Sequence, residues 1–211
     1  MQKAVFVAAY RLLCCALTLS ATSYSIALRW HAPTFRLSNF FSYFTQLSSL
    51  YAAAVLAAGL WLATRPPSRR YESARGAVVL YMAIAGIVYA LLLADVDALH
   101  HATPHYTNWV LHRIMPIAVF LDWLYVAPRV RIDWSHLARW LAFPLAYLGY
   151  TLVRGAFVDW YPYPFVDPRA HGYLIVAAYS GAIAAGSIGF AALIVLLGNW
   201  AGAPAPQTER A

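Results

Sequence analysis

A threonine and a histidine in two separate apolar segments are the residues of this sequence best suited to chemistry. Thr45 lies in the stretch NFFSYFTQLSSL at positions 39–50, and His112 lies in NWVLHRIMP at positions 108–116. A hydroxyl is a weak nucleophile until a neighbouring base takes its proton, and histidine accepts protons near neutral pH. The pair is therefore suited to attack on an ester carbonyl, with Thr45 as nucleophile and His112 as base.

Polar side chains around Thr45 form a stripe if this stretch is the outer part of one membrane-spanning helix. At 100° per residue they fall within an arc of about 120°. Lipid cannot satisfy hydrogen bonds, so such a stripe must face protein or water. A plainer interpretation is that these side chains bond their own backbone or a neighbouring helix. The stripe consists of Ser38, Asn39, Ser42, Thr45, Gln46 and Ser49.

Four polar residues are predicted to support the Thr45–His112 pair. Asn39, Gln46 or Asn108 would donate hydrogen bonds to the oxyanion that develops on the carbonyl oxygen. Asn108 shares a helix face with His112, so it is also placed to orient the imidazole. The supporting residues are Asn39, Ser42, Gln46 and Asn108.

The composition of the chain is that of an integral membrane protein. Of 211 residues, 62% are hydrophobic and 11% are charged, with a mean hydropathy of +0.58. Soluble proteins carry about 25% charged residues. The formal net charge of +7 is explained by basic loops that fix membrane orientation. We therefore expect no nucleic acid as a partner.

Six apolar segments predict an all-α fold, a polytopic transmembrane six-helix bundle in a single domain over residues 1–200. Each segment has about the 20 residues that a span needs. Arginines gather in the loops after the second and fourth spans, which predicts that both termini are cytoplasmic in a plasma-membrane protein. The tail at 201–211 is expected to be disordered. The predicted spans are 4–28, 38–63, 76–94, 107–127, 136–153 and 172–197.

Three strings carry a resemblance to a known family. FFSYFTQLSSL, NWVLHRIMPIAVFLDWL and WYPYPFVD resemble the androgen-induced-protein family of six-span membrane proteins, in particular its bacterial branch. The likeness covers most of positions 39–167. It implies a threonine hydrolase of fatty acid esters of hydroxy fatty acids, with Thr45 as nucleophile and His112 as general base. Membrane lipid or a fatty acid ester is then the expected partner.

The sequence departs from that family in two places. Arg113 follows His112 where the eukaryotic members have small polar residues, and the surroundings of Thr45 are richer in Ser and Gln. Arg113 is placed either to extend outward to the membrane surface or to hold a carboxylate.

Two other functions fit the same residues. A cluster of carboxylates and imidazoles in one loop has the ligand chemistry of zinc, which would make the protein a zinc-dependent membrane hydrolase. The polar stripe could instead bind a lipid or a partner helix without catalysis. We expect no cofactor, because no nucleotide-binding loop, haem-type histidine pair or quinone motif is evident, and the favoured site has no metal. The cluster consists of Asp95, Asp97, His100, His101 and His105.

Two further features have structural interpretations. Arg11 and Asp122 lie in the inner thirds of their spans, where an unpaired charge is costly, so we predict an ion pair between them. The loop DWYPYPFVDP at 159–168 is stiffened by prolines. It is interpreted as a lid over an outward cavity or as part of an aromatic belt at the membrane surface.

Overall fold

The computed structural model describes residues 2–66, 68–100 and 103–202, and over these residues the chain is helical without a strand. This confirms the all-α prediction. The predicted disordered tail lies outside the described residues from position 203 onward. The helices are α1 Gln2–Arg29, α2 Leu37–Phe40, α3 Phe44–Trp61, α4 Arg69–Val88, η1 Tyr89–Leu93, α5 Ala94–His100, α6 His105–Trp109, η2 Val110–Ile114, α7 Met115–Tyr125, α8 His136–Val158, η3 Pro164–Val166 and α9 Pro168–Ala201.

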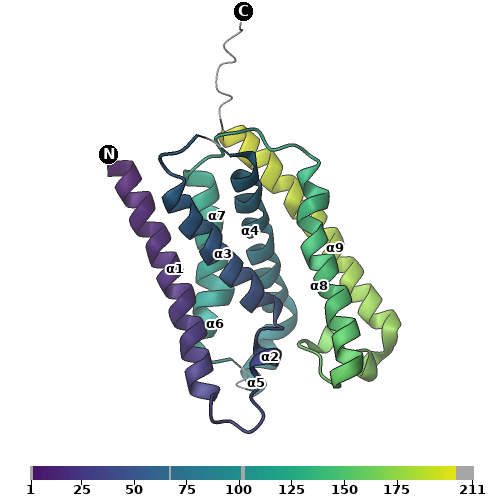
Figure 1. Ribbon diagram of the computed structural model, residues 1–211. Coiled ribbons are helices and arrows are strands. Elements are labelled where there is room, and N and C mark those ends of the chain that lie inside the picture. The colour runs from purple at the N-terminus through teal and green to yellow at the C-terminus, as the bar shows by residue number, and fades with distance from the viewer. Residues whose placement is uncertain (1, 67, 101–102, 203–211) are drawn as a thin grey trace, which may run out of the picture.

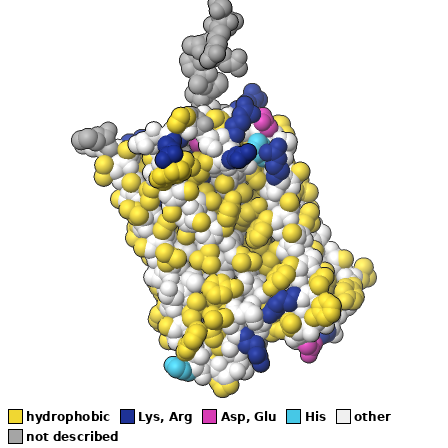
Figure 2. Space-filling model, in the orientation of Figure 1, with side chains coloured by type: hydrophobic (Ala, Val, Ile, Leu, Met, Phe, Trp, Pro, Cys, Tyr) yellow, Lys and Arg dark blue, Asp and Glu magenta, His cyan; other side chains and the backbone are white. Residues whose placement is uncertain are grey.

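The helices form a bundle with two parts (Figure 1). Helices α1, α3, α4 and α6–α7 lie side by side, and α8 and α9 form a pair next to α4. Both ends of the chain lie at the same end of the bundle, and α2 and α5 lie at the opposite end. Figure 2 shows apolar side chains over the middle of the visible face, and most of its Lys and Arg side chains near the chain termini.

Five helices are long and apolar enough to cross a membrane, which is compatible with an integral membrane protein. They are Gln2–Arg29, Phe44–Trp61, Arg69–Leu99, His136–Val158 and Gly172–Ala201. The fourth predicted span is helical from His105 to Tyr125 but is not among them. It carries Asn108, His112, Arg113 and Asp122, which are unfavourable in hydrocarbon. The count of six spans is therefore not confirmed.

The second predicted span is not one continuous helix. Helix α2 ends at Phe40, the chain turns, and α3 begins at Phe44 after an extended Tyr43 (φ −76°, ψ 133°). Tyr147 of α8 holds this break, because its hydroxyl accepts from the Phe44 amide at 3.1 Å and donates to the Ser42 carbonyl at 2.8 Å. The expected polar stripe along a single helix is thereby interrupted, and Thr45 lies in the first turn of α3.

The predicted ion pair between Arg11 and Asp122 is present and belongs to a larger cluster. Arg11 Nε lies 2.8 Å from Asp122 Oδ1 and Nη2 lies 3.0 Å from Oδ2. Arg75 Nη2 lies 2.9 Å from Asp122 Oδ2, and Arg75 Nη1 lies 2.8 Å from Glu72 Oε2. These four side chains are at most 5% exposed. Two positive and two negative charges thus balance between α1, α4 and α7.

Candidate functional site

Thr45 and His112 lie in hydrogen-bond contact. Thr45 Oγ1 is 3.2 Å from His112 Nε2. Thr45 is buried in the first turn of α3, and His112 is half-buried in η2. If the threonine hydroxyl donates to Nε2, the imidazole proton is on Nδ1, and this is the tautomer that can accept the hydroxyl proton.

Proline chemistry explains why His112 lies on a π-turn. Pro116 has no amide hydrogen to donate to the His112 carbonyl four residues before it. The Met115 amide instead bonds to the Val110 carbonyl, five residues back. Gly86 lets α4 pack against this turn, since a Cβ there would lie 3.0 Å from Pro116 Cγ and 3.2 Å from the His112 carbonyl oxygen. Single π-turns within α-helices are frequent at functional sites.

A second π-turn places Tyr89 against the histidine. Tyr89 begins η1, and its ring stacks on His112 with centroids 4.0 Å apart and planes at 17°. The Tyr89 hydroxyl donates to Asp97 Oδ2 at 2.8 Å. Asn108 Nδ2 donates to the same oxygen at 2.6 Å and also contacts the Tyr89 hydroxyl. A carboxylate, a phenol and an amide thus form a network on the side of the imidazole that carries Tyr89.

The predicted supporting residues divide into two groups. The Asn108 side chain bonds to Asp97 and contacts the hydroxyl of Tyr89, whose ring stacks on the imidazole. Gln46 lines the cavity at Thr45, and its Oε1 accepts from Thr22 at 3.3 Å. Asn39 and Ser42 instead meet α8. Asn39 Oδ1 accepts from Arg154 at 2.6 Å, and Ser42 Oγ bonds to the Tyr150 hydroxyl at 2.8 Å.

Thr45 lies where two cavities of different character meet. The polar cavity, about 160 Å³, is lined by residues that include Arg29, Thr45, Gln46, Asp97, Thr107 and His112. The apolar cavity, also about 160 Å³, lies between Thr45 and the α8–α9 pair and is lined by residues that include Phe44, Ile84, Leu141, Leu145, Ile183 and Ile188. Thr45, Leu93 and Tyr163 line both cavities. A molecule with one polar and one apolar part fits this division.

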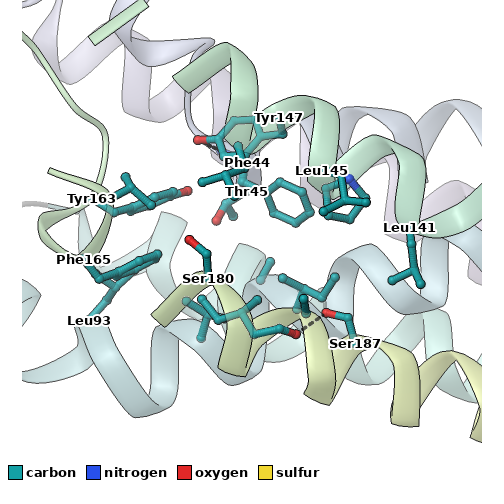
Figure 3. A pocket seen from close by; sticks show the side chains of 18 of the residues that line it. Phe44, Thr45, Leu93, Leu141, Leu145, Tyr147, Tyr163, Phe165, Ser180 and Ser187 are labelled. Carbon is teal, nitrogen blue, oxygen red and sulfur yellow. Dashed lines mark hydrogen bonds between the residues drawn. The ribbon is translucent and has the colours of Figure 1, made fainter. Parts of the chain in front are cut away.

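The loop at 159–167 covers the site. Pro162, Tyr163 and Pro164 line the polar cavity. Figure 3 shows the hydroxyls of Tyr163, Thr45 and Ser180 turned toward one another. Burial raises the pKa of Tyr163 to about 12, and hydrogen bonding from Thr45 offsets only part of that rise. Tyr163 therefore stays a protonated hydroxyl beside the threonine at neutral pH.

An arginine at the start of α9 holds this loop in place. Arg169 Nη1 donates to the Asp159 carbonyl at 3.0 Å, and Nη2 donates to Asp167 Oδ2 at 2.6 Å. The ring of Tyr161 packs where a Cβ on Gly155 of α8 would be, at 2.1 Å from Tyr161 Cε1. Both ends and the middle of the loop are thus fixed to helices, with Tyr163 between them.

The described residues of the zinc alternative form no metal-binding group. Among the described residues, no group of three His, Cys, Asp or Glu side chains is placed to hold a metal ion. His101 and the side chain of His100 lie outside the described part, and Asp97 is bonded to Tyr89 and Asn108. Arg113 is exposed and lies over the Trp109 ring at 4.4 Å, away from both cavities.

Three residues at the site were not singled out for this role from the sequence. Tyr89 lies in an apolar segment without a local polar pattern. Asp97 was grouped with the metal-type cluster, and Tyr163 was considered only as part of the aromatic loop. The spacing of Asn108, His112 and Pro116 does predict an irregular helix at the histidine, because Pro116 cannot donate a hydrogen bond to the His112 carbonyl and so disturbs the helix there.

No protein-family model, curated protein or solved structure matches this chain.

Proposed function

We propose that this protein is a membrane hydrolase of the threonine type that acts on fatty acyl esters. One observation carries the proposal. Thr45 Oγ1 lies 3.2 Å from His112 Nε2, at the junction of a polar and an apolar cavity. The distance is within the reach that a general base needs. An ester whose carbonyl lies beside Thr45 would place its polar part in one cavity and its apolar part in the other.

In the acylation step, Thr45 Oγ1 attacks the ester carbonyl carbon while its proton passes to His112 Nε2. The carbonyl π electrons move to oxygen and form a tetrahedral oxyanion. The break before α3 places the start of this helix at the site, where main-chain amides lack helical acceptors. The Phe44 amide is bonded to Tyr147. The Thr45 amide and the Tyr163 hydroxyl remain as the proposed oxyanion donors.

The intermediate then collapses and the enzyme is regenerated. The bond to the leaving alkoxide breaks as His112 Nε2 returns its proton to that oxygen, which leaves an acyl ester on Thr45. A water molecule gives its proton to Nε2 and attacks the acyl carbon. Collapse of this second intermediate releases the carboxylic acid and returns the proton to Thr45. The net reaction is ester plus water to acid plus alcohol.

Tyr89 and Asp97 support the imidazolium that forms in each half-reaction. The face of an aromatic ring attracts a cation, and the Tyr89 ring lies parallel to the imidazole at a centroid distance of 4.0 Å. Asp97 accepts hydrogen bonds from Tyr89 and Asn108, so its negative charge is held beside the histidine. Asn108 acts in this proposal as a positioning residue.

The proposed setting is the plasma membrane, with both termini in the cytoplasm and the site toward the outer surface. Figure 2 supports this orientation, because most Lys and Arg side chains of the visible face lie near the chain termini, as expected for the cytoplasmic side. Thr45 lies in the first turn of α3, toward the opposite end of the bundle. Substrate would reach it from the outer leaflet.

Hydrolysis of a palmitate ester by purified protein in detergent tests the proposal. Wild type should hydrolyse the ester, Thr45→Ser should retain much of the rate, and Thr45→Ala and His112→Ala should each lose nearly all of it. Thr107→Ala is the matched control, because Thr107 lines the same cavity but donates to the Ala21 carbonyl at 3.1 Å. Lipid binding without hydrolysis by folded wild type would contradict the proposal and favour a binding protein.

A further inference from the structure

Two buried side chains bring hydrogen-bonding groups to the polar cavity. Gln46 lines this cavity and is 6% exposed. Its Oε1 accepts from Thr22 at 3.3 Å, while its Nε2 has no hydrogen-bond partner in the described part of the chain. Ser25 also lines the cavity and is 1% exposed, and its hydroxyl makes no hydrogen bond to any described residue. Because buried polar groups are nearly always paired with protein, water or ligand, the two side chains predict a polar occupant.

The helix period of α1 explains why these two groups lie together. Thr22 and Ser25 are three residues apart and therefore share one face of α1, and Thr22 contacts Gln46 of α3. Gln46 follows Thr45 directly in the sequence. The amide and the hydroxyl thus lie beside the reactive threonine, where α1 meets α3.

The same cavity also offers an acceptor, and its charged lining is balanced. Asp97 Oδ2 accepts from Tyr89 and Asn108, and Asp97 Oδ1 makes no hydrogen bond within the described ranges. The Arg, Lys, Asp and Glu residues that line the cavity are Arg29 and Asp97, one of each sign. An uncharged ligand with both donors and acceptors fits such a lining better than an anion does. A hydroxyl group is both a donor and an acceptor.

The size of the polar cavity limits the alcohol part of an ester that it can hold. Its volume of about 160 Å³ is roughly half of the 300 Å³ at the lower end of small-molecule sites. A long alkyl chain there would cover the Gln46 amide and the Ser25 hydroxyl without bonding to them, and each group left unpaired weakens binding about fivefold or more. The hydroxy fatty acid implied by the family resemblance therefore fits poorly. Glycerol fits, because its free hydroxyls lie only a few bonds from the ester oxygen.

We propose that the substrate is an acyl ester of a small neutral polyol such as glycerol, and that Gln46 and Ser25 select this alcohol. The inference rests on the proposed function, because it places the ester carbonyl beside Thr45. Gln46 Nε2 donates to one hydroxyl of the alcohol, and Ser25 Oγ bonds to another. The ester oxygen then lies on the side of His112, which lines the same cavity and protonates this oxygen as the alcohol leaves.

The test compares kcat/KM for three palmitate esters, with glycerol, propanol or hydroxystearic acid as the alcohol part. A site built to bond a substrate hydroxyl discriminates against an analogue without it, so wild type should prefer the glycerol ester to the propyl ester at least about tenfold. Ser25→Ala and Gln46→Met should each lower the glycerol value at least about fivefold and leave the propyl value within about twofold.

Ser49→Ala is the matched control and should leave all three values unchanged. Ser49 is 0% exposed, but it bonds to Met82 Sδ at 3.8 Å and lines neither cavity. The highest value for the hydroxystearate ester, or a glycerol preference that both Ser25→Ala and Gln46→Met leave unchanged, would overturn the inference. Thr45-dependent hydrolysis without a glycerol preference would also overturn it and leave the proposed function standing.

Binding of two ethers gives a readout that does not need turnover. Hexadecyl glyceryl ether and hexadecyl propyl ether keep the two alcohol parts but cannot be hydrolysed as esters. Native mass spectrometry of the detergent-purified protein should show the glyceryl ether bound at least about tenfold more tightly. Ser25→Ala should remove most of this difference, and Ser49→Ala should retain it. Equal binding of the two ethers, or no binding of either, would overturn the inference, whereas the expected preference without ester hydrolysis would contradict catalysis alone.

Discussion

Replacing Asp122 with asparagine should destabilise the protein strongly, because two buried arginines share this carboxylate. Arg11 and Arg75 approach its oxygens to between 2.8 and 3.0 Å. The substitution keeps the side-chain shape but leaves the cluster, which also contains Glu72, with one uncompensated positive charge. Breaking a buried pair in this way costs about 3–5 kcal/mol. For a chain of this size that corresponds to a fall in Tm of roughly 6–20 °C.

The two cysteines provide the assay. Cys14 is 3% exposed and Cys15 is partly buried, so a thiol-reactive fluorogenic dye reports unfolding in detergent as temperature rises. Asp133→Asn is the control, since the Asp133–Arg69 pair is 3.3 Å apart but its side chains are 53% and 73% exposed. Exposed pairs contribute only about 0–1 kcal/mol. Equal Tm values for Asp122→Asn and Asp133→Asn would refute the argument that burial makes this cluster structural.

Three further predictions concern the site. Gly86→Ala should lower kcat roughly tenfold, because the added Cβ would press on the His112 carbonyl and on Pro116. Gly149→Ala is the control and should leave kcat unchanged, since nothing lies within 4 Å of a Cβ there. Equal kcat values for the two variants would contradict the packing argument. Arg169→Ala should speed hydrogen exchange of the amides at 163–167, because this arginine ties the loop to Asp159 and Asp167; unchanged exchange would show that the loop is held by other contacts. The free energy of unfolding should fall as pH rises above about 10, because the tyrosine ionises there in the unfolded chain while folded Tyr163 keeps its proton to about 12. Tyr163→Phe should reduce this pH dependence in thermal unfolding, and an unchanged dependence would contradict the raised pKa.

The helical nature of the chain and its buried ion pair could be predicted from general rules. Long apolar segments require helices because lipid satisfies no backbone group. Arg11 and Asp122 were paired because a lone charge in hydrocarbon is too costly. Arg75 lies one residue before the third predicted span, 76–94, and was not expected in this cluster. In the structure it is 3% exposed and completes the charge balance from within α4.

The local geometry of the site depends on contacts that sequence patterns do not contain. The segment between Phe40 and Phe44 has no proline or glycine to signal a break. The break is held by Tyr147, which is 103 residues from Phe44, so a helix period alone predicts that the helix continues. Two π-turns, one at Tyr89 and one at His112, bring these side chains together. Only the second can be predicted from the sequence, from the proline at 116. The 3.2 Å contact of Thr45 with His112 depends on both features.

Labelling with a fluorophosphonate probe tests the central claim most directly, because the probe bonds only to an activated hydroxyl or a comparable nucleophile. Purified wild type in detergent should be labelled, and peptide mass spectrometry should place the adduct on Thr45. Thr45→Ala and His112→Ala should both abolish labelling, while Thr107→Ala should retain it. Absence of labelling in wild type shown to be folded by the thiol-dye assay, or an adduct that persists in His112→Ala, would contradict a threonine activated by this histidine.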